Sequence, residues 1–325
     1  MTILNNELIL SKISNISYNN GQKLSSTISD IVIKDRNIGF SIDITNNSIS
    51  EAEIIRAAAI EQLQTIDNVG KITIVLTGNK KNQSKSKHYI DGVKKVILVA
   101  AGKGGVGKST ISALIAERLN LAGQRVGIAD ADIYGPSIPQ IFGVHNKPGI
   151  IDKKMVPLNS RNIQIISIGF LIKDEAVAWR GPMASKAIYQ LLSLTKWDNL
   201  DYLIIDMPPG TGDIHLAILE NYHVDGVVIV STPQLLSRND VVKAISLYQK
   251  FDLPILGIIE NMKLLIDDSG NQTTIFFGNS GNDLAAKFSI PFLYQIPILS
   301  EISKACDNGT SLVDIVKLPI DFLLK

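Results

Sequence analysis

The stretch "VILVAAGKGGVGKST", Val96 to Thr110, decides the fold of most of the chain. Within it, Gly102 to Ser109 fits the pattern G-x-x-x-x-G-K-[ST]. An apolar run precedes this pattern, and a helical sequence follows it from Ser109 to about Leu121, closed by Gly123. A strand, a glycine-rich loop and a helix in this order form the setting in which the pattern binds phosphate. The sequence therefore predicts a nucleotide site here.

The loop holds two lysines, and a phosphate cradle needs only one. Its glycines let backbone N–H groups turn toward phosphate oxygens, and the dipole of the following helix adds positive potential. We expect Lys108 to hold the β- and γ-phosphates and Ser109 to ligate Mg²⁺. The predicted nucleotide contacts run through the whole loop: Gly102, Lys103, Gly104, Gly105, Val106, Gly107, Lys108, Ser109 and Thr110.

Short apolar runs rich in Ile and Val recur from Val93 onward, separated by helical sequence. Runs of this kind, apolar on both faces, are typical of parallel strands covered by helices on both sides. We therefore expect residues 93–325 to form an α/β domain, a doubly wound, mostly parallel sheet of the P-loop NTPase class. The runs are "KKVILVA", "RVGIA", "IQIISIG", "YLIID", "GVVIVS" and "PILGII".

Acidic residues follow two of these predicted strands, at the carboxyl edge where such sheets bind ligands. Asp206 ends "YLIID" and is the candidate that acts on Mg²⁺ or its water. The loop after it carries glycines that can approach the γ-phosphate. Asp130 and Asp132 lie in "DADIYGPS", and Asp132 is the candidate that orients the attacking water. The alternative for each of these two acids is that it caps the next turn.

The first 79 residues show a different pattern of predicted helices and strands. They show a small α+β pattern, with a helix from Asn6 to Ile13, a half-buried strand marked by alternating Ile38, Phe40 and Ile42, a second helix, and the strand "KITIVLTG". Residues 80–92 begin with a lysine-rich run without acidic residues. This segment is predicted to be a basic flexible linker, with a phosphate-binding patch as the alternative.

Composition excludes several classes of protein. A formal net charge of +1 gives no general attraction to nucleic acid or to an anionic membrane. No stretch approaches the roughly 18 uninterrupted apolar residues of a membrane span. The single cysteine, Cys306, excludes an internal disulfide and fits a reducing compartment. We therefore expect a cytoplasmic protein that binds neither nucleic acid nor membrane.

Seven sequence blocks, in order, resemble those of the Mrp/ApbC/Nbp35 family of P-loop ATPases, a MinD-like group with a deviant Walker A motif. The front of the chain is similar to the small MIP18-like domain that often precedes this ATPase in bacterial Mrp proteins. The blocks are "GKGGVGKST", "DADIYGPS", "RGPM" (from Arg180), "DMPPGTGD", "STPQ", "ENM" and "IFFG".

The resemblance implies roles that the residues alone do not give. It implies ATP as the nucleotide and a homodimer in which Lys103 reaches the partner's nucleotide site and supports catalysis there, much as an arginine finger does. It implies that Asn261 hydrogen-bonds adenine and that Pro297 lies near the base. It also implies that the protein binds iron–sulfur clusters and transfers them to apo client proteins.

One expected motif is missing. Family members that carry clusters usually have a C-x-x-C pair after the "ENM" block, whereas the stretch from Lys263 to Thr274 contains neither cysteine nor histidine. Cys306 is expected to be a small core side chain, and the alternative is one ligand of a cluster completed from outside. Two other functions stay open: a MinD-type nucleotide-dependent scaffold without a cluster, and a carboxylate-phosphorylating enzyme similar to dethiobiotin synthetase, which "RGPM" and the absence of an added substrate domain disfavour.

Two further residues are left with alternative roles. His215 follows the predicted switch loop and either touches phosphate or is solvated or packed. Trp179, beside Arg180, either shapes the nucleotide or dimer face or packs.

Overall fold

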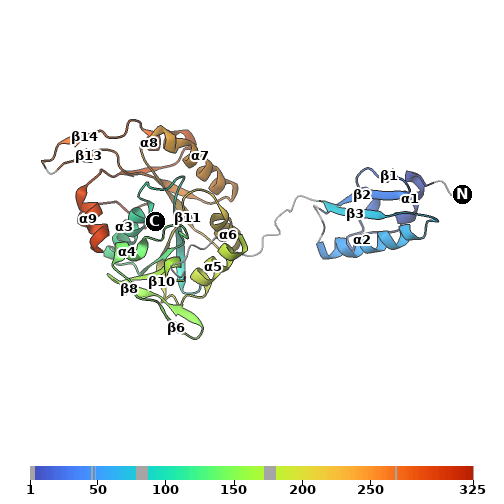
Figure 1. The fold of residues 1–325 in the computed structure, drawn as a ribbon, viewed down its shortest axis with the longest axis horizontal. Helices are drawn as coiled ribbons and strands as arrows, with labels where there is room; N and C mark the ends of the chain where they lie inside the picture. Colours follow the sequence, from blue (N-terminus) through green and yellow to red (C-terminus); the bar gives the residue numbers. More distant parts are fainter. Residues whose placement is uncertain are drawn as a thin grey trace. The chain divides into compact units, whose positions relative to one another are not determined.

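The chain forms two compact units, Met1–Lys85 and Ser86–Lys325. The structure, a computed structural model, describes residues 4–44, 47, 49–77, 87–171, 181–267 and 269–324 (Figure 1). Each unit has its own buried core.

The front unit is a three-stranded sheet with two helices. Strand β2 (Asn37–Asp43) lies between β1 (Val32–Lys34), antiparallel to it, and β3 (Ile72–Thr77), parallel to it. The alternating residues of β2 behave as predicted, because Ile38, Phe40 and Ile42 are buried. They pack with side chains of α1 (Asn6–Ile13) and α2 (Ile49–Gln64) in one core, and a short helix, η1 (Leu24–Ser26), adds Leu24. This unit is the predicted small α+β domain.

The second unit is built on an eight-stranded sheet whose order is β15-β12-β11-β4-β10-β5-β9-β8. All neighbouring pairs are parallel except β8 and β9 at one edge. The predicted apolar runs all become strands of this sheet. Its strands are β4 (Val93–Ala101), β5 (Val126–Asp130), β8 (Leu158–Ser160), β9 (Ile163–Ser167), β10 (Leu200–Asp206), β11 (Gly226–Ser231), β12 (Ile255–Glu260) and β15 (Phe292–Gln295).

Helices cover both faces of this sheet, as a doubly wound fold requires (Figure 1). One face packs against α3 (Lys108–Leu121), α4 (Ile138–Phe142), α9 (Ser300–Asn308) and the segment after α9. The other face packs against α5 (Gly181–Ser193), α6 (Asp213–Asn221), α7 (Leu235–Lys250) and α8 (Ser280–Phe288). Smaller elements are the hairpins β6 (Gly149–Ile151) with β7 (Lys154–Val156) and β13 (Leu265–Ile266) with β14 (Gln272–Thr273), and η2 (Ile168–Phe170).

Strand register brings the predicted acids together. In the sheet, Asp206 of β10 is paired with Asp130 of β5 on one side and with Val99 of β4 on the other. Because all three strands run parallel, their carboxyl ends meet at one edge, where β4 continues into the glycine-rich loop. The doubly wound topology therefore places loop and acids side by side.

The segment before β4 differs from the predicted linker in its last part. His88 bridges to Tyr222, and the His88 N–H donates to the Asn221 carbonyl oxygen at 2.8 Å. Ile90 is buried in the core of the second unit. Backbone pairing and an apolar anchor thus fix residues 87–92, whereas residues 78–86 lie outside the described ranges. The division at residues 79 and 93 stays a prediction.

Among the described residues, no helix is both long and apolar enough to span a bilayer.

Candidate nucleotide site

The glycine-rich loop adopts a conformation that only some residues permit. Its N-terminal cap for α3 is Gly107, whose φ of 83° lies in the left-handed region. The backbone angle therefore favours glycine, and a Cβ there would also displace the Asn261 side-chain nitrogen. At the front of the loop, a Cβ on Gly102 would lie 2.4 Å from the backbone of Asp240, so the loop packs tightly on α7. These contacts fix the cradle at both ends.

A pocket of about 380 Å³ opens above this loop. The loop and the start of α3 line one side, the segment after β5 a second, and α4 with α9 a third, while Pro209 of the loop after β10 completes it. The first turn of α3 lines this space, and the first N–H groups of a helix have no partner within the helix, which suits an anion.

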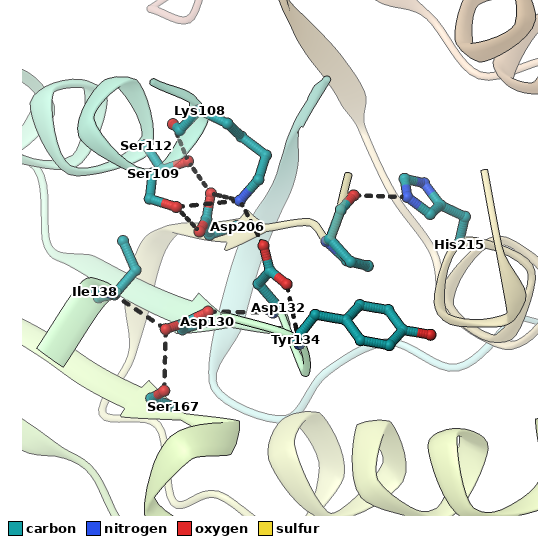
Figure 2. A network of polar contacts seen from close by, with 11 residues as sticks. Lys108, Ser109, Ser112, Asp130, Asp132, Tyr134, Ile138, Ser167, Asp206 and His215 are labelled. Carbon is teal, nitrogen blue, oxygen red and sulfur yellow. Dashed lines mark hydrogen bonds and ion pairs between the residues drawn. The ribbon is translucent and has the colours of Figure 1, made fainter. Parts of the chain in front are cut away.

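Lys108 lies at the centre of a buried polar network (Figure 2). Its ammonium is 2.7 Å from Asp206 Oδ1 and 3.6 Å from Asp132 Oδ2. Asp206 also accepts hydrogen bonds of 2.6 Å from the hydroxyls of Ser109 and Ser112. The predicted residues Lys108, Ser109, Asp132 and Asp206 are thus in one cluster.

The oxygen atoms of this cluster fit a magnesium ion. Mg²⁺ binds oxygen ligands and in phosphate sites usually takes only one or two protein groups, with phosphates and water completing the shell. The Ser109 hydroxyl and the Asp206 carboxylate, already 2.6 Å apart, are groups of that kind. Within the described ranges, no cluster of three or more His, Cys, Asp or Glu suggests a different metal site. Ser109 and Asp206 would therefore hold Mg²⁺ beside the phosphates.

The two acids after β5 have different surroundings. Asp130 is fully buried and accepts from the backbone of Asp132 and Ile138 and from the Ser167 hydroxyl, at 3.0 to 3.2 Å. Burial, together with nearby Asp206, raises the pKa of Asp130 well above its usual range. Asp130 thus holds the loop that follows β5, and these contacts agree with the alternative that Asp130 caps the next turn.

Asp132 lines the pocket, where its Oδ2 faces Lys108, and its Oδ1 accepts from the Tyr134 N–H at 3.2 Å. It therefore caps a turn and also presents a carboxylate oxygen to the pocket. The assignment of water orientation to Asp132 stays a prediction.

Lys103 has a partner that the sequence did not indicate. Its ammonium donates to the side-chain oxygen of Gln234 at 2.8 Å, and Gln234 belongs to the "STPQ" block before α7. Lys103 is partly exposed and lines the pocket. Its implied role in a partner subunit's site stays a prediction.

Asn261 and Pro297 do not line the pocket. The Asn261 amide donates to the Val106 carbonyl oxygen at 2.9 Å, so it supports the glycine-rich loop from outside. Adenine contacts for Asn261 and Pro297 stay predictions. Trp179 and Arg180 lie outside the described residues.

Cys306 lies on α9 at the rim of the nucleotide pocket, half-buried, with its sulfur 3.7 Å from the Thr110 hydroxyl oxygen. It packs against the core of that face, in agreement with the core-side-chain expectation, but it also reaches the site. Burial raises the pKa of its thiol.

The wall formed by α4 and α9 was not predicted. Gln140 and Ile141 of α4 and Asp307 of α9 line the pocket, yet the two helices lie far apart in the sequence and these residues match no motif. An ion pair between the buried Glu117 of α3 and the partly exposed Arg161 holds this wall. Arg161 donates to the carbonyl oxygens of Ile141 and Gly309 at 2.8 and 2.6 Å, and Glu117 accepts from the N–H of Leu312 at 2.7 Å.

His215 is buried away from solvent, with no contact to the pocket opening. Its two ring nitrogens contact the Tyr248 hydroxyl and the Pro208 carbonyl oxygen. The packing alternative is thus confirmed for this residue in place of the solvated one.

Known proteins resemble this chain along its length. A family model described as ParA, NUBPL iron-transfer P-loop NTPase, matches residues 92–318. An iron-sulfur cluster carrier protein of Rickettsia felis is 56% identical over 324 residues, which cover 98% of this chain and 99% of the relative.

Solved structures share the fold of the second unit. A nucleotide-binding protein of Archaeoglobus fulgidus, in complex with ADP, is 39% identical with a TM-score of 0.60, over 67% of this chain and 88% of the other. The cell division ATPase MinD of Pyrococcus furiosus shows the same fold at 20% identity and a TM-score of 0.50, over 67% of this chain and 90% of the other.

Proposed function

This chain belongs to the ParA-type family of NUBPL iron-transfer P-loop NTPases, and on that premise we propose that it carries iron–sulfur clusters to apoproteins in a cycle driven by ATP and Mg²⁺. The observation that carries the nucleotide part is the cluster of Lys108, Ser109, Asp132 and Asp206 at the helix N-terminus. The cargo is proposed from the relatives named iron-sulfur cluster carrier proteins.

The residues of the pocket divide the work of phosphoryl transfer to water. Lys108 and the loop N–H groups bind and orient the phosphates, and Lys108 exchanges part of its contact with Asp206 for phosphate oxygens. Ser109 and Asp206 would hold Mg²⁺, which would supply charge neutralisation on the phosphates. Asp132, already in the pocket, orients the attacking water and accepts its proton.

Lys103 acts across a homodimer in this proposal. Its ammonium is held by the neutral amide of Gln234, so in this contact its charge is not cancelled by a carboxylate. A cation on a partly exposed loop at the pocket rim is suited to reach the phosphates of a second copy, where charge spreads over the transferred group in the transition state.

The cluster is cargo, and the chain does not offer a complete set of ligands for it. Stable ligation of a four-iron cluster uses four thiolates, and two copies of this chain have two cysteines. Cys306 contacts Thr110 at the nucleotide pocket, and burial disfavours its thiolate. The stretch that carries C-x-x-C in family members forms the β13–β14 hairpin without cysteine. The missing ligands are therefore proposed to come from a small thiol or the client.

Anaerobic reconstitution tests the cargo. The protein is mixed with iron and sulfide, with and without a small thiol, and then with an apoprotein that has a four-cysteine site. We expect well under one stable cluster per two chains, a gain with the small thiol, and transfer that depends on ATP. Cys306→Ser should remove the residual iron. A stoichiometric cluster that survives this substitution would show that other ligands hold it.

A second candidate function is a nucleotide-dependent scaffold that carries no cluster, as in MinD-type proteins. The single cysteine favours it. The same experiment separates the two functions, because the scaffold would bind no cluster with or without thiol and would transfer none, while ATP hydrolysis would persist.

A further inference from the structure

The loop that follows Asp206 enters the nucleotide pocket through Pro209. This residue lines the pocket, and a Cβ on Gly104 would lie 3.9 Å from its ring, so the two loops face each other. Gly210, with φ 88°, has open space where a Cβ would lie. The position of Pro209 therefore decides how closely this loop can approach the phosphates bound in front of it.

The backbone on each side of Pro209 is pinned. On one side, the Gly210 N–H donates to the carbonyl oxygen of Ala101, the last residue of β4, at 3.0 Å. On the other side, the Pro208 carbonyl oxygen lies 3.0 Å from Nε2 of His215, which comes from α6. The second hydrogen bond comes from a side chain, so a substitution at His215 can remove it without changing the sequence of the loop.

The proton positions in this contact follow from the groups involved. A carbonyl oxygen only accepts, so Nε2 of His215 carries the proton and donates it to Pro208. In a neutral imidazole, Nδ1 then accepts, so the Tyr248 hydroxyl donates to it at 2.9 Å. Burial lowers the pKa of His215 to about 4, which keeps the ring neutral near pH 7. The hydrogen bonds thus run in one direction, from Tyr248 to His215 to Pro208.

This chain of hydrogen bonds connects the pocket loop to α7. Tyr248 is fully buried near the end of α7. The same helix packs on the front of the glycine-rich loop, where the backbone of Asp240 lies against Gly102. Both sides of the phosphate pocket are therefore supported by one helix, by backbone packing at Gly102 and through His215 at Pro208.

We propose that His215 is a positioning residue for ATP hydrolysis: it sets the place of the Pro208–Pro209 segment against the phosphates and ties that segment to α7 through Tyr248. The two ring nitrogens of His215 contact the Tyr248 hydroxyl and the Pro208 carbonyl oxygen, and neither of these groups belongs to the catalytic cluster. The effect of His215 on hydrolysis therefore passes through the Pro208 carbonyl. The proposal rests on ATP hydrolysis alone and is independent of cluster carriage.

Two substitutions separate the two nitrogens of His215. In His215→Gln, the side-chain amide reaches the Nε2 position and keeps the donor to Pro208. In His215→Asn, the shorter amide keeps an acceptor for Tyr248 and loses the donor to Pro208. We expect His215→Asn to lower kcat about 10- to 100-fold, since small displacements near the reacting groups have effects of this size. We expect the kcat of His215→Gln to stay within about threefold of that of the unchanged protein, because the position of the loop is preserved.

Nucleotide affinity and a matched pair of tyrosine variants distinguish a positioning role from general damage to the pocket. Affinity for a labelled ADP should be equal in both variants, because Lys108 and the loop N–H groups are untouched. Tyr248→Phe removes only the hydroxyl that orients the ring and should lower kcat by a smaller factor than His215→Asn. Its matched control is Tyr222→Phe, a buried tyrosine on the same side of the sheet whose hydroxyl contacts Ser193 at 2.8 Å; this variant should keep kcat.

Equal kcat in His215→Asn and His215→Gln would overturn the proposal. So would a loss of kcat matched by an equal loss of ADP affinity, which would mean that the pocket as a whole is damaged. If His215→Asn does not fold, the comparison of Tyr248→Phe with Tyr222→Phe decides: equal kcat in these two variants overturns the link to α7 and with it the proposal.

Discussion

Lys108 and Lys103 lie at opposite ends of one loop, and their surroundings differ in kind. Lys108 is 7% exposed and paired with the carboxylates of Asp206 and Asp132. Lys103 is partly exposed and donates to the neutral amide of Gln234. The same side-chain type is thus fixed by opposite charges at one end and, among the described residues, held by a polar contact with a neutral amide at the other.

The difference has an energetic meaning. Removing one partner of a buried ion pair costs about 3–5 kcal/mol, because the other charge is left buried. A hydrogen bond of the kind between Lys103 and Gln234 contributes about 0.5–1.5 kcal/mol, or up to about 3 kcal/mol with the ammonium charge. Lys108 is therefore part of the framework of its own pocket. Lys103 can leave Gln234 at a small free-energy cost, which a contact with a phosphate bound to a second copy of the chain can offset.

The largest effect is expected at the buried end. Lys108→Ala should lower ATP affinity by at least about 100-fold and abolish turnover, because it removes a charge-assisted phosphate contact and leaves Asp206 buried beside phosphate. Titration with a labelled ATP analogue measures the affinity. Lys147→Ala, at an exposed lysine in the same unit, is the control. Unchanged affinity in Lys108→Ala would place the nucleotide elsewhere.

The two acids beside Lys108 should differ from each other. Asp132→Asn should keep ATP affinity and lower kcat by about 10²- to 10⁴-fold, since the amide cannot accept a proton from water. Asp206→Asn should instead raise the Mg²⁺ concentration needed for half-maximal activity, because the amide is a weaker ligand than the carboxylate. A magnesium titration of both variants measures this, and identical curves would contradict the division of roles.

The exposed end should give a different pattern. Lys103→Ala should leave ATP affinity within a few-fold and lower turnover by about 100-fold, as for the loss of one donor to a transition state. Light scattering on the ATP-bound form, together with a turnover assay, would report both dimer formation and hydrolysis. Full activity in a monomeric ATP complex would remove the difference between the two lysines.

The smallest effect is expected on the stability contributed by His215, the residue that connects the loop after Asp206 to α7. In the unfolded chain, this histidine binds a proton below its pKa of about 6.5. In the folded chain, burial lowers the pKa to about 4, so the ring stays neutral down to about that pH. The folded state is therefore destabilised as pH falls, by about 1 kcal/mol between pH 7 and 5.5 for this residue. His215→Gln lacks this proton.

Urea unfolding at the two pH values measures the difference. The stability advantage of the unchanged protein over His215→Gln should shrink by about 1 kcal/mol from pH 7 to 5.5. A constant difference would show that the histidine is solvated in the folded state.

Much of this architecture could be predicted because the signals are local. Each parallel strand is a continuous apolar run, since both of its faces are buried, and the glycine-rich loop needs its residues at fixed spacing over Gly102 to Ser109. Asp206 and Asp132 could be placed at the same edge because parallel strands end together.

The other side of the pocket had no local signal. Gln140 and Asp307 are brought together by the packing of α4 on α9 and by the Glu117–Arg161 ion pair. Cys306 was expected in the core because a lone cysteine packs well, and only the position of α9 shows that its sulfur also reaches Thr110. Asn261 likewise supports the loop through Val106, a contact that joins residues distant in the sequence.

The sequence by itself determined the doubly wound sheet, the small front domain, the phosphate loop and the acids that serve it, because hydrophobic period and motif spacing act within one element or between neighbouring strand ends. Only the tertiary structure decided that Lys103 rests on Gln234, that Asp130 shapes a loop, and that His215 donates to Pro208. Each of these contacts depends on the direction of a side chain after distant helices have packed, and no periodicity in the sequence encodes that direction.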